Sequence, residues 1–259
     1  MNNFPSRPAN AIRVDTGQRS EHVETLAEET PVALVYNGLS HVVMMVTPTD
    51  LDDFAYGFSL TEGIVESADE IAIVDRLETT HGISLEMRIP QARFDVLDQR
   101  SRNLTGRTGC GLCGAATLSA AIRPVRRATS PARIDADALC DAFGELETRQ
   151  PLNAETGAVH AAAVIDAEGR LHVREDVGRH NALDKVVGGA LRAGLEPRAL
   201  LVTSRASYEI VHKAAQVDIG LVAAISAPTA LAVRIADEAG IVLIGFARGR
   251  RLTVYAGDL

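Results

Sequence analysis

Cys110 and Cys113 are separated by two residues in the glycine-rich segment TGCGLCG, residues 108–114. Glycines beside each cysteine let another molecule approach the backbone closely. The run 115–122 predicts a helix just behind the pair, and a helix N-terminus together with Arg107 favours the thiolate form of a nearby cysteine. Because Cys110 lies nearer to Arg107, we predict that it is the nucleophile and that Cys113 resolves or shields its product. Such a thiolate can accept sulfur and pass it on.

A single C-x-x-C pair has two other common uses, half of a zinc site and a redox disulfide. Structural zinc sites take four ligands, and the sequence offers no second cysteine pair. A thioredoxin-like pair starts a helix after the first strand of a βαβ unit, whereas this pair precedes a linker-like segment. The third cysteine, Cys140, lies near Phe143 in a predicted helix, which indicates packing. We therefore expect no bound zinc.

Two further segments place charged or hydroxyl groups beside predicted strands. The first, REDVGRHNALDK at 174–185, crowds the end of a strand and the start of a helix. A site would form there, although a capped helix with a solvated charged face has the same composition. The second, TSRAS at 203–207, puts Arg205 and hydroxyl groups between a buried strand and a helix. It predicts an anion site, although serine and threonine are also ordinary helix caps.

The segment FARGRR follows the last apolar strand of the chain, and its residues are Phe246, Ala247, Arg248, Gly249, Arg250 and Arg251. Three arginines and a glycine at the carboxyl end of a strand suit a diphosphate, because guanidinium groups bind phosphate through paired hydrogen bonds. The alternative is a basic surface turn.

In the first half of the chain the pattern predicts a small α+β domain. Residues 1–30 are polar and lack periodicity, which predicts a mobile tail or an edge segment. Two apolar runs, 31–36 and 41–47, are joined by Asn-Gly, the strongest short hairpin signal. A helix follows from about residue 50 to Gly63, and alternation over 83–89 predicts a half-buried strand. We place this domain at 31–122, with the cysteine loop at 106–114.

Residues 123–133, RPVRRATSPAR, combine prolines and arginines without periodicity and predict a linker, or else a long loop within one domain. In the second half, 134–259, a helix at about 135–148 precedes strands at 160–166 and 171–175. Apolar runs at 199–203, 221–225 and 241–246 then alternate with helices. This pattern predicts an α/β domain with a parallel portion, whose ligands lie at the carboxyl ends of the strands.

Composition narrows the function classes. The 259 residues are 46% hydrophobic, so the chain can bury a large core. A net charge of -8 argues against a nucleic-acid partner, since nucleic-acid binding requires a basic surface. No apolar stretch has the length of a membrane span, and the first 18 residues are polar. We expect a soluble, cytoplasmic protein with no membrane association.

Taken together, these segments resemble the FdhD family of accessory sulfurtransferases for formate dehydrogenase. The similarity runs through TPTDLDDFAYGFSLTEGIV, TGCGLCG, TGAVHAA, REDVGRHNALDK, SRASYEIVHKAA, ISAPTALAV and GFARGRRLTVY, and so covers nearly the whole chain. REDVGRHNALDK is the most specific of them. One departure is Ala158, where glycine is common in the family, and it affects only the turn before His160.

The resemblance implies a C-terminal domain of cytidine-deaminase-like, three-layer fold, a smaller N-terminal α+β domain and a homodimer. It implies transfer of sulfur from a cysteine desulfurase to the molybdenum cofactor in its bis-guanine-dinucleotide form, Mo-bis-MGD, for use by formate dehydrogenase. By similarity, Cys110 forms the persulfide and residues 246–251 contact the guanine-nucleotide-containing cofactor. We add Arg205 to that cofactor site because it also lies at the end of a predicted strand.

Three rival functions remain to be weighed. Zinc deaminases need H-x-E and a downstream P-C-x-x-C, whereas the corresponding positions here are His160-Ala161-Ala162 and the segment SRAS at 204–207. The catalytic carboxylate and the metal thiolates of a deaminase are thus missing from the sequence. A non-catalytic chaperone for the molybdenum cofactor and a thiol-disulfide oxidoreductase both remain possible alternatives to a persulfide carrier.

Overall fold

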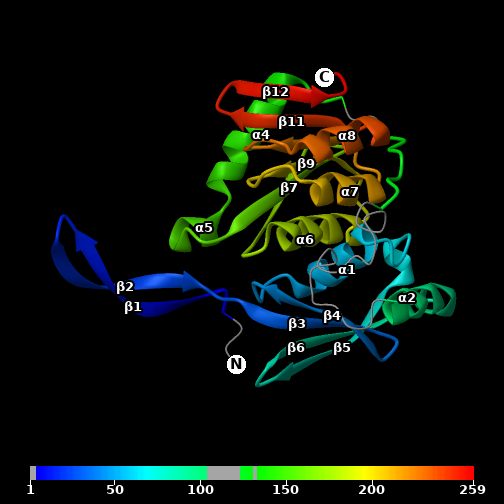
Figure 1. The fold of residues 1–259 in the computed structure, drawn as a ribbon, viewed down its shortest axis with the longest axis horizontal. Coiled ribbons are helices and arrows are strands. Elements are labelled where there is room, and N and C mark those ends of the chain that lie inside the picture. Colours follow the sequence, from blue (N-terminus) through cyan, green and yellow to red (C-terminus); the bar gives the residue numbers. More distant parts are fainter. Residues whose placement is uncertain (1–3, 104–122, 131–132) are drawn as a thin grey trace.

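A computed structural model describes residues 4–103, 123–130 and 133–259, with the side chains of 100–103 left aside. The described chain forms three sheets, with strand orders β1-β2, β4-β3-β6-β5 and β12-β11-β10-β9-β7-β8 (Figure 1). Cys110 and Cys113 lie outside the described residues. Within those residues, no helix is long and apolar enough to cross a membrane.

The four-stranded sheet and its helix α1 form the first half of the described chain. Its strands are β3 (Thr30–Tyr36), β4 (Leu39–Val46), β5 (Ala72–Thr79) and β6 (Gly82–Arg88). The predicted hairpin is confirmed, with Asn37 and Gly38 at φ 49° and 84° in the turn. One face of this sheet packs on α1 (Leu51–Thr61), which buries Phe54 and Phe58 there. The predicted end of α1 near Gly63 is also confirmed, since the Gly63 amide donates to the Leu60 carbonyl.

The six-stranded sheet forms the second half. Its strands are β7 (His160–Asp166), β8 (Leu171–Asp176), β9 (Pro197–Val202), β10 (Leu221–Ala224), β11 (Val242–Arg248) and β12 (Arg251–Ala256). As predicted, β9, β10 and β11 are parallel, while β7, β8 and β12 run antiparallel to their neighbours. The α/β class is therefore confirmed, and the cytidine-deaminase-like assignment stays a prediction.

Helices cover both faces of the six-stranded sheet and make three layers (Figure 1). On one face lie α6 (Arg179–Arg192), α7 (Tyr208–Gln216) and α8 (Ala230–Ala239). On the other lies α4 (Ala136–Thr148), the helix expected at 135–148, with Leu139, Phe143 and Leu146 against the strands. A short helix, α5 (Pro151–Thr156), follows it. Cys140 is half-buried on α4, which agrees with a packing role.

Helices α1 and α6 pack against each other and join the two sheets (Figure 1). Glycine is required at this crossing, because a Cβ on Gly57 would overlap the Asp184 carbonyl and one on Gly188 would overlap the Asp53 carbonyl. The predicted linker also packs on the second half, since the Ala128 amide donates to the Ala239 carbonyl. The domain boundaries themselves remain a prediction.

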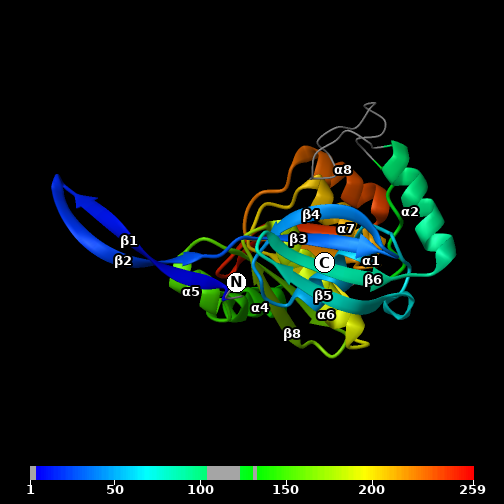
Figure 2. The same ribbon diagram turned by 90° about the horizontal axis from the view of Figure 1, so that it is seen from below.

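Residues 6–27 do not form the predicted tail. Strands β1 (Ser6–Asp15) and β2 (Gln18–Ala27) form a separate antiparallel ribbon that projects from the body (Figures 1 and 2). Both strands contain many polar residues, so the sequence does not show the alternation of apolar and polar residues that is typical of a half-buried strand. The short helix η1 (Ala68–Glu70) and the longer, charged helix α2 (Gln91–Asn103) were also missed.

Candidate functional site

Three loops follow the parallel strands and meet at one edge of the six-stranded sheet. We call the loops 203–207, 225–229 and 246–250 the carboxyl edge. They are tied by hydrogen bonds from the Thr229 amide to the Ala206 carbonyl at 3.0 Å and from the Phe246 amide to the Ser226 carbonyl at 3.2 Å. Helices α7 and α8 begin directly after the first two loops, so their amide ends face the same edge. Segments 203–207 and 246–251, which the sequence placed at two strand ends, belong to the ends of β9 and β11, and β10 lies between these strands.

Two arginines of the predicted cofactor site lie exposed on the carboxyl edge. Arg205 follows β9, and Arg248 ends β11 with its Nε donating to the Ile225 carbonyl at 3.0 Å. Phe246 is half-buried in the left-handed region at φ 52°, a conformation that non-glycine residues seldom adopt. Ala247, next to it, is buried in the sheet. This edge can therefore offer an anion two guanidinium groups and two helix N-termini.

Arg250 and Arg251 are oriented differently from Arg248. The side chain of Arg250 lies 3.0 Å from Asp141 and 3.5 Å from Asp137, both on α4. Arg251 starts β12 and is exposed, and Gly249 makes the tight turn between the strands at φ 56°. The six residues at 246–251 thus form a hairpin tip, with Arg250 turned toward acidic side chains that compete with a ligand for it.

Half of the segment REDVGRHNALDK is buried and none of it is fully exposed, unlike the solvated face considered above. Asp176 accepts the Thr47 amide at 2.9 Å and the Asn181 side chain at 2.9 Å, and it pairs with Lys185 at 2.7 Å. Lys185 also donates to the Thr47 carbonyl at 2.8 Å. Burial lowers the pKa of Lys185 although Asp176 opposes that shift. Glu175 accepts the first amides of α5.

A second buried group connects α6 with α7 and α1. Asp184 lies 2.7 Å from Lys213, which also contacts Glu62 at 3.1 Å. Burial lowers the pKa of Lys213, but Asp184 and Glu62 outweigh it, so that pKa is raised. Burial raises the pKa of Glu62, but the charges of Lys213 and Arg123 bring it to about 2. We call Asp176, Lys185, Asp184, Lys213 and Glu62 the ionic core.

Arg123, where the described chain resumes after the cysteine segment, is anchored to this core. Its guanidinium lies 2.9 Å from Glu62, and its backbone amide donates to the Tyr208 hydroxyl at 2.9 Å. Tyr208 is the first residue of α7, directly after the loop that carries Arg205. Arg123 is therefore fixed close to the start of α7.

A cluster of two histidines, an arginine and a glutamate, which was not predicted from the sequence, lies near the starts of β7, α6 and α7. His180 Nε2 lies 2.8 Å from Glu209 Oε2, and Arg179 lies 3.9 Å from the same carboxylate. Burial lowers the pKa of His160, and the charges of Arg179 and His180 lower it further, which keeps it neutral near pH 7. Arg179 and His180 belong to the segment 174–185, where a site was predicted, and Glu209 directly follows SRASY, but nothing in the sequence linked the two segments. Among the described residues no cluster of His, Cys, Asp and Glu could hold a metal ion.

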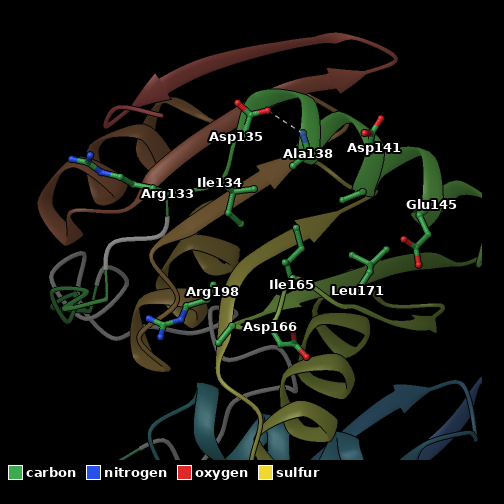
Figure 3. A pocket seen from close by; sticks show the side chains of 13 residues that line it. Arg133, Ile134, Asp135, Ala138, Asp141, Glu145, Ile165, Asp166, Leu171 and Arg198 are labelled. Atoms are coloured by element: carbon green, nitrogen blue, oxygen red, sulfur yellow. Dashed lines mark hydrogen bonds between the residues drawn. The ribbon is translucent and has the colours of Figure 1, made fainter.

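A cavity in the described part of the chain lies away from the carboxyl edge. It measures about 830 Å³ and is lined by α4, the end of β7 and the start of β9 (Figure 3). Because β7 is antiparallel to β9, this cavity is at the opposite end of the strands from the carboxyl edge. Its Asp166 is already bonded to Arg170 and His172, both at less than 3 Å. Burial raises the pKa of Asp166, but these partners bring it to about 2, so Asp166 is held as a paired carboxylate.

Comparisons with known proteins identify the family of this chain and a structure of similar fold. The model of the FdhD/NarQ family matches residues 27–258. The chain is 50% identical over 256 residues to the sulfur carrier protein FdhD of Xanthomonas euvesicatoria, covering 97% of this chain and 91% of the relative. It is 50% identical over 236 residues to that of Cupriavidus necator, covering 90% and 82%. A solved structure of a putative formate dehydrogenase accessory protein from Desulfotalea psychrophila superposes with a TM-score of 0.75 at 25% identity, covering 98% of each chain.

Proposed function

This chain belongs to the FdhD/NarQ family, and we propose that it is a sulfur carrier which serves formate dehydrogenase in the cytoplasm. In this proposal a cysteine desulfurase supplies sulfur, Cys110 carries it as a persulfide, and Mo-bis-MGD receives it. The protein acts as a homodimer. The single observation that carries the proposal is the pairing of a C-x-x-C segment with an exposed cationic carboxyl edge in one chain.

The first chemical step is thiol exchange. The Cys110 thiolate attacks the terminal sulfur of the desulfurase persulfide, the sulfur–sulfur bond breaks, and the desulfurase cysteine leaves as a thiolate. Cys110 then holds one extra sulfur atom, and no oxidant is consumed. Attack by the Cys113 thiolate on Cys110 would release that atom as hydrosulfide and leave a disulfide, so the two cysteines together supply the two electrons. A cellular dithiol would reduce that disulfide again.

The carboxyl edge supports binding of the acceptor by its nucleotide ends. Arg205 and Arg248 are exposed, and two helices direct amide groups toward the same loops. Diphosphates favour such surroundings, because guanidinium groups and helix N-termini both bind phosphate oxygens. Phe246 adds a half-buried ring beside them. In this proposal the main contacts with the nucleotide come from Phe246, Arg248 and Arg205. The shape of the loop is set by its other residues, Ala247, Gly249, Arg250 and Arg251.

The anchor at Arg123 supports cooperation between the cysteines and the edge. Ten peptide units separate Cys113 from Arg123. Because an extended chain spans about 3.6 Å per residue, the distance from Arg123 to Cys113 can be at most about 36 Å. Arg123 is bonded to the first residue of α7. A segment tethered there can approach both a docked desulfurase and the acceptor in turn.

Intact-mass analysis after incubation with a cysteine desulfurase and cysteine tests the proposal. The parent chain should gain the mass of one sulfur atom, and a Cys110→Ser variant should gain none and fail to activate formate dehydrogenase. A Cys113→Ser variant should keep part of both properties. Extra sulfur on Cys113 in the Cys110→Ser chain, with full activation, would assign the nucleophile to the other cysteine.

The same experiment separates a second candidate, a cofactor-binding chaperone without sulfur chemistry. This candidate is favoured by the carboxyl edge itself, because Arg205 and Arg248 need no cysteine in order to bind nucleotides. If the parent chain binds GDP and activates formate dehydrogenase but never gains sulfur, the chaperone function replaces the carrier function.

Elemental analysis tests the expected absence of zinc. One zinc atom per chain, lost in a Cys110→Ser Cys113→Ser double variant, would overturn that expectation.

A further inference from the structure

The cluster of two histidines, an arginine and a glutamate described above lies beside loop 203–207 of the carboxyl edge. Because β7 runs antiparallel to β9, His160 at the start of β7 lies at the end of the sheet where β9 finishes. The Ala161 amide donates to Thr203 Oγ1 at 2.9 Å, which ties the start of β7 to this loop. The cluster is therefore a direct neighbour of the nucleotide site proposed above.

Two helices begin at this cluster without a side chain that caps them. Gly178 has no side chain to cap the 14-residue helix α6, and Ser207 makes no side-chain cap bond to the nine-residue helix α7. In α4 and α8, by contrast, Asp135 and Thr229 accept amide hydrogens of the first turn. Amide ends without a side-chain cap favour an anion. Arg179, the first residue of α6, adds a guanidinium group to them.

A hydroxyl and a ring nitrogen supply the observation that points to a ligand. A serine before a helix usually accepts an amide hydrogen of that helix. Ser207 Oγ instead is shielded from solvent and has no hydrogen-bond partner within the part of the chain that the structure describes. The same holds for His180 Nε2, which lies 2.8 Å from Glu209 Oε2 without the alignment of a hydrogen bond. Because a buried polar atom without a partner is unfavourable, an occupant that bonds to both atoms fits this position.

The side chains of the cluster favour a small anion that also carries a hydrogen. Arg179, Ser207 and the amide ends donate hydrogen bonds, whereas the Glu209 carboxylate only accepts them. His180 and Glu209 are each 25% exposed, so an occupant is partly enclosed and can enter from solvent. Hydrosulfide meets both demands, because its charged sulfur accepts hydrogen bonds and its S–H group donates to a carboxylate. A halide ion has the charge but no hydrogen for Glu209.

We propose that this cluster holds hydrosulfide between its release from Cys110 and its transfer to the acceptor. We call the cluster the sulfide site, and its residues are Arg179, His180, Ser207 and Glu209. The inference rests on the proposed function, in which the Cys113 thiolate attacks Cys110, a disulfide forms, and hydrosulfide leaves with the electron pair of the broken sulfur–sulfur bond. Hydrosulfide that left the protein would be diluted into the solvent. The sulfide site keeps it at the edge to which the proposed function assigns the acceptor.

Nuclear magnetic resonance of the histidine rings tests direct binding. The full chain with Cys110→Ser and Cys113→Ser is titrated with sodium hydrosulfide under reducing conditions, so that sulfur cannot be held on either cysteine. The His180 signal should shift and reach saturation. His172 is the internal control, because it is bonded to Asp166 at the opposite end of β7, and its signal should not follow the titration. His180→Gln and His172→Gln variants assign the two signals.

Bromide separates hydrosulfide from anions in general, because it has the same charge and no hydrogen to donate. The chain should bind hydrosulfide more tightly than bromide. Glu209→Ala should lower this preference by about tenfold or more, because the acceptor of the S–H group is lost. Loss of the negative charge acts on both anions alike, so the ratio of affinities isolates the hydrogen bond. Ser207→Ala should weaken both anions. Glu145→Ala on α4 is the matched control and should change neither affinity.

Each result decides a separate point. A His180 signal that does not respond to hydrosulfide overturns the sulfide site, and equal affinities for hydrosulfide and bromide overturn the assignment to sulfur. Circular dichroism checks that each variant keeps its fold. Neither result depends on a persulfide, since both cysteines are replaced in the titrated chain.

A last measurement tests the role of the site in the chain that retains both cysteines. A Glu209→Ala variant should still gain the mass of one sulfur atom from the desulfurase. During turnover it should release more sulfide into solution than the parent chain and activate formate dehydrogenase less. Equal release of sulfide would overturn the holding role. A parent chain that gains no sulfur would instead overturn the proposed function, whatever the titration with hydrosulfide shows.

Discussion

The ionic core and the carboxyl edge have similar charged residues in opposite surroundings. In the core, Lys213 and Asp184 are almost fully buried and paired at 2.7 Å. At the edge, Arg205 and Arg248 are exposed, and Arg248 bonds only a backbone carbonyl among the described residues. Both regions come from segments that place charges beside strand ends. A charged side chain that is buried and paired stabilises the fold, whereas one that is exposed and has no charged partner is available to a ligand.

The largest expected effect comes from breaking the core. A Lys213→Met substitution leaves Asp184 and Glu62 without their shared cation, and removal of one partner of a buried pair costs about 3–5 kcal/mol. Chemical denaturation of the variant should show this loss in the free energy of unfolding. Arg248→Ala is the control and should change stability by less than about 0.5 kcal/mol. Equal effects from the two substitutions would erase the distinction between the regions.

The stability of the ionic core should depend on pH in the acid range, because Glu62 must be charged to pair with Lys213. The folded pKa of Glu62 is about 2 against an ordinary value of 4.5. A depressed folded pKa means that its contribution is complete above pH 4.5 and is lost as the pH falls toward 2, by about 3 kcal/mol. Glu62→Gln should flatten the fall in stability across that window. An unchanged slope in the variant would show that other carboxylates cause the acid sensitivity.

At the edge we expect binding rather than stability to change. Arg248→Ala should weaken GDP binding by about 1.5–3 kcal/mol, the value of a hydrogen bond to a charged group. Isothermal titration calorimetry measures this change, and Arg205→Ala should act in the same direction. Unaltered GDP affinity in an Arg205→Ala Arg248→Ala chain would remove the nucleotide site from the carboxyl edge.

The smallest expected effect is at Arg250. Its partners Asp137 and Asp141 are exposed, and exposed ion pairs contribute about 0–1 kcal/mol. Arg250→Ala should therefore change the free energy of unfolding by less than about 1 kcal/mol and weaken GDP binding less than Arg248→Ala does. A larger loss of affinity at Arg250 than at Arg248 would mean that the ligand displaces the α4 carboxylates.

Local patterns predicted the elements whose signals are contained within a few residues. The Asn37-Gly38 turn needs positive φ, and the apolar runs before loops 203–207 and 225–229 identified buried parallel strands. These strands in turn placed Arg205 and Arg248 on one edge. The same logic failed for the ribbon, because strands that contact the rest of the described chain only near their base, at α5, need no continuous apolar face.

The ionic core was beyond local patterns for a different reason. Asp184 and Lys213 belong to separate helices, and Lys185 meets the Thr47 carbonyl across 138 positions. A charged residue in a helix sequence has the same signature whether it meets water or a distant counter-ion. The segment 174–185 was therefore expected to form a site or a solvated face, and the structure shows that none of its residues is fully exposed. Cys110 and Cys113 lie outside the described residues, so their roles rest on the sequence.

The buried pair of Asp184 and Lys213 also constrains how this sequence can change over generations. A buried ion pair can often be replaced as a unit by apolar residues at little cost, whereas removal of one member is severe. The two codons are far enough apart that one mutation must come first. That first mutant carries a lone buried charge and is selected against before the second can arise. The pair can therefore persist through the poor fitness of the intermediates, even where a better-packed alternative exists two substitutions away.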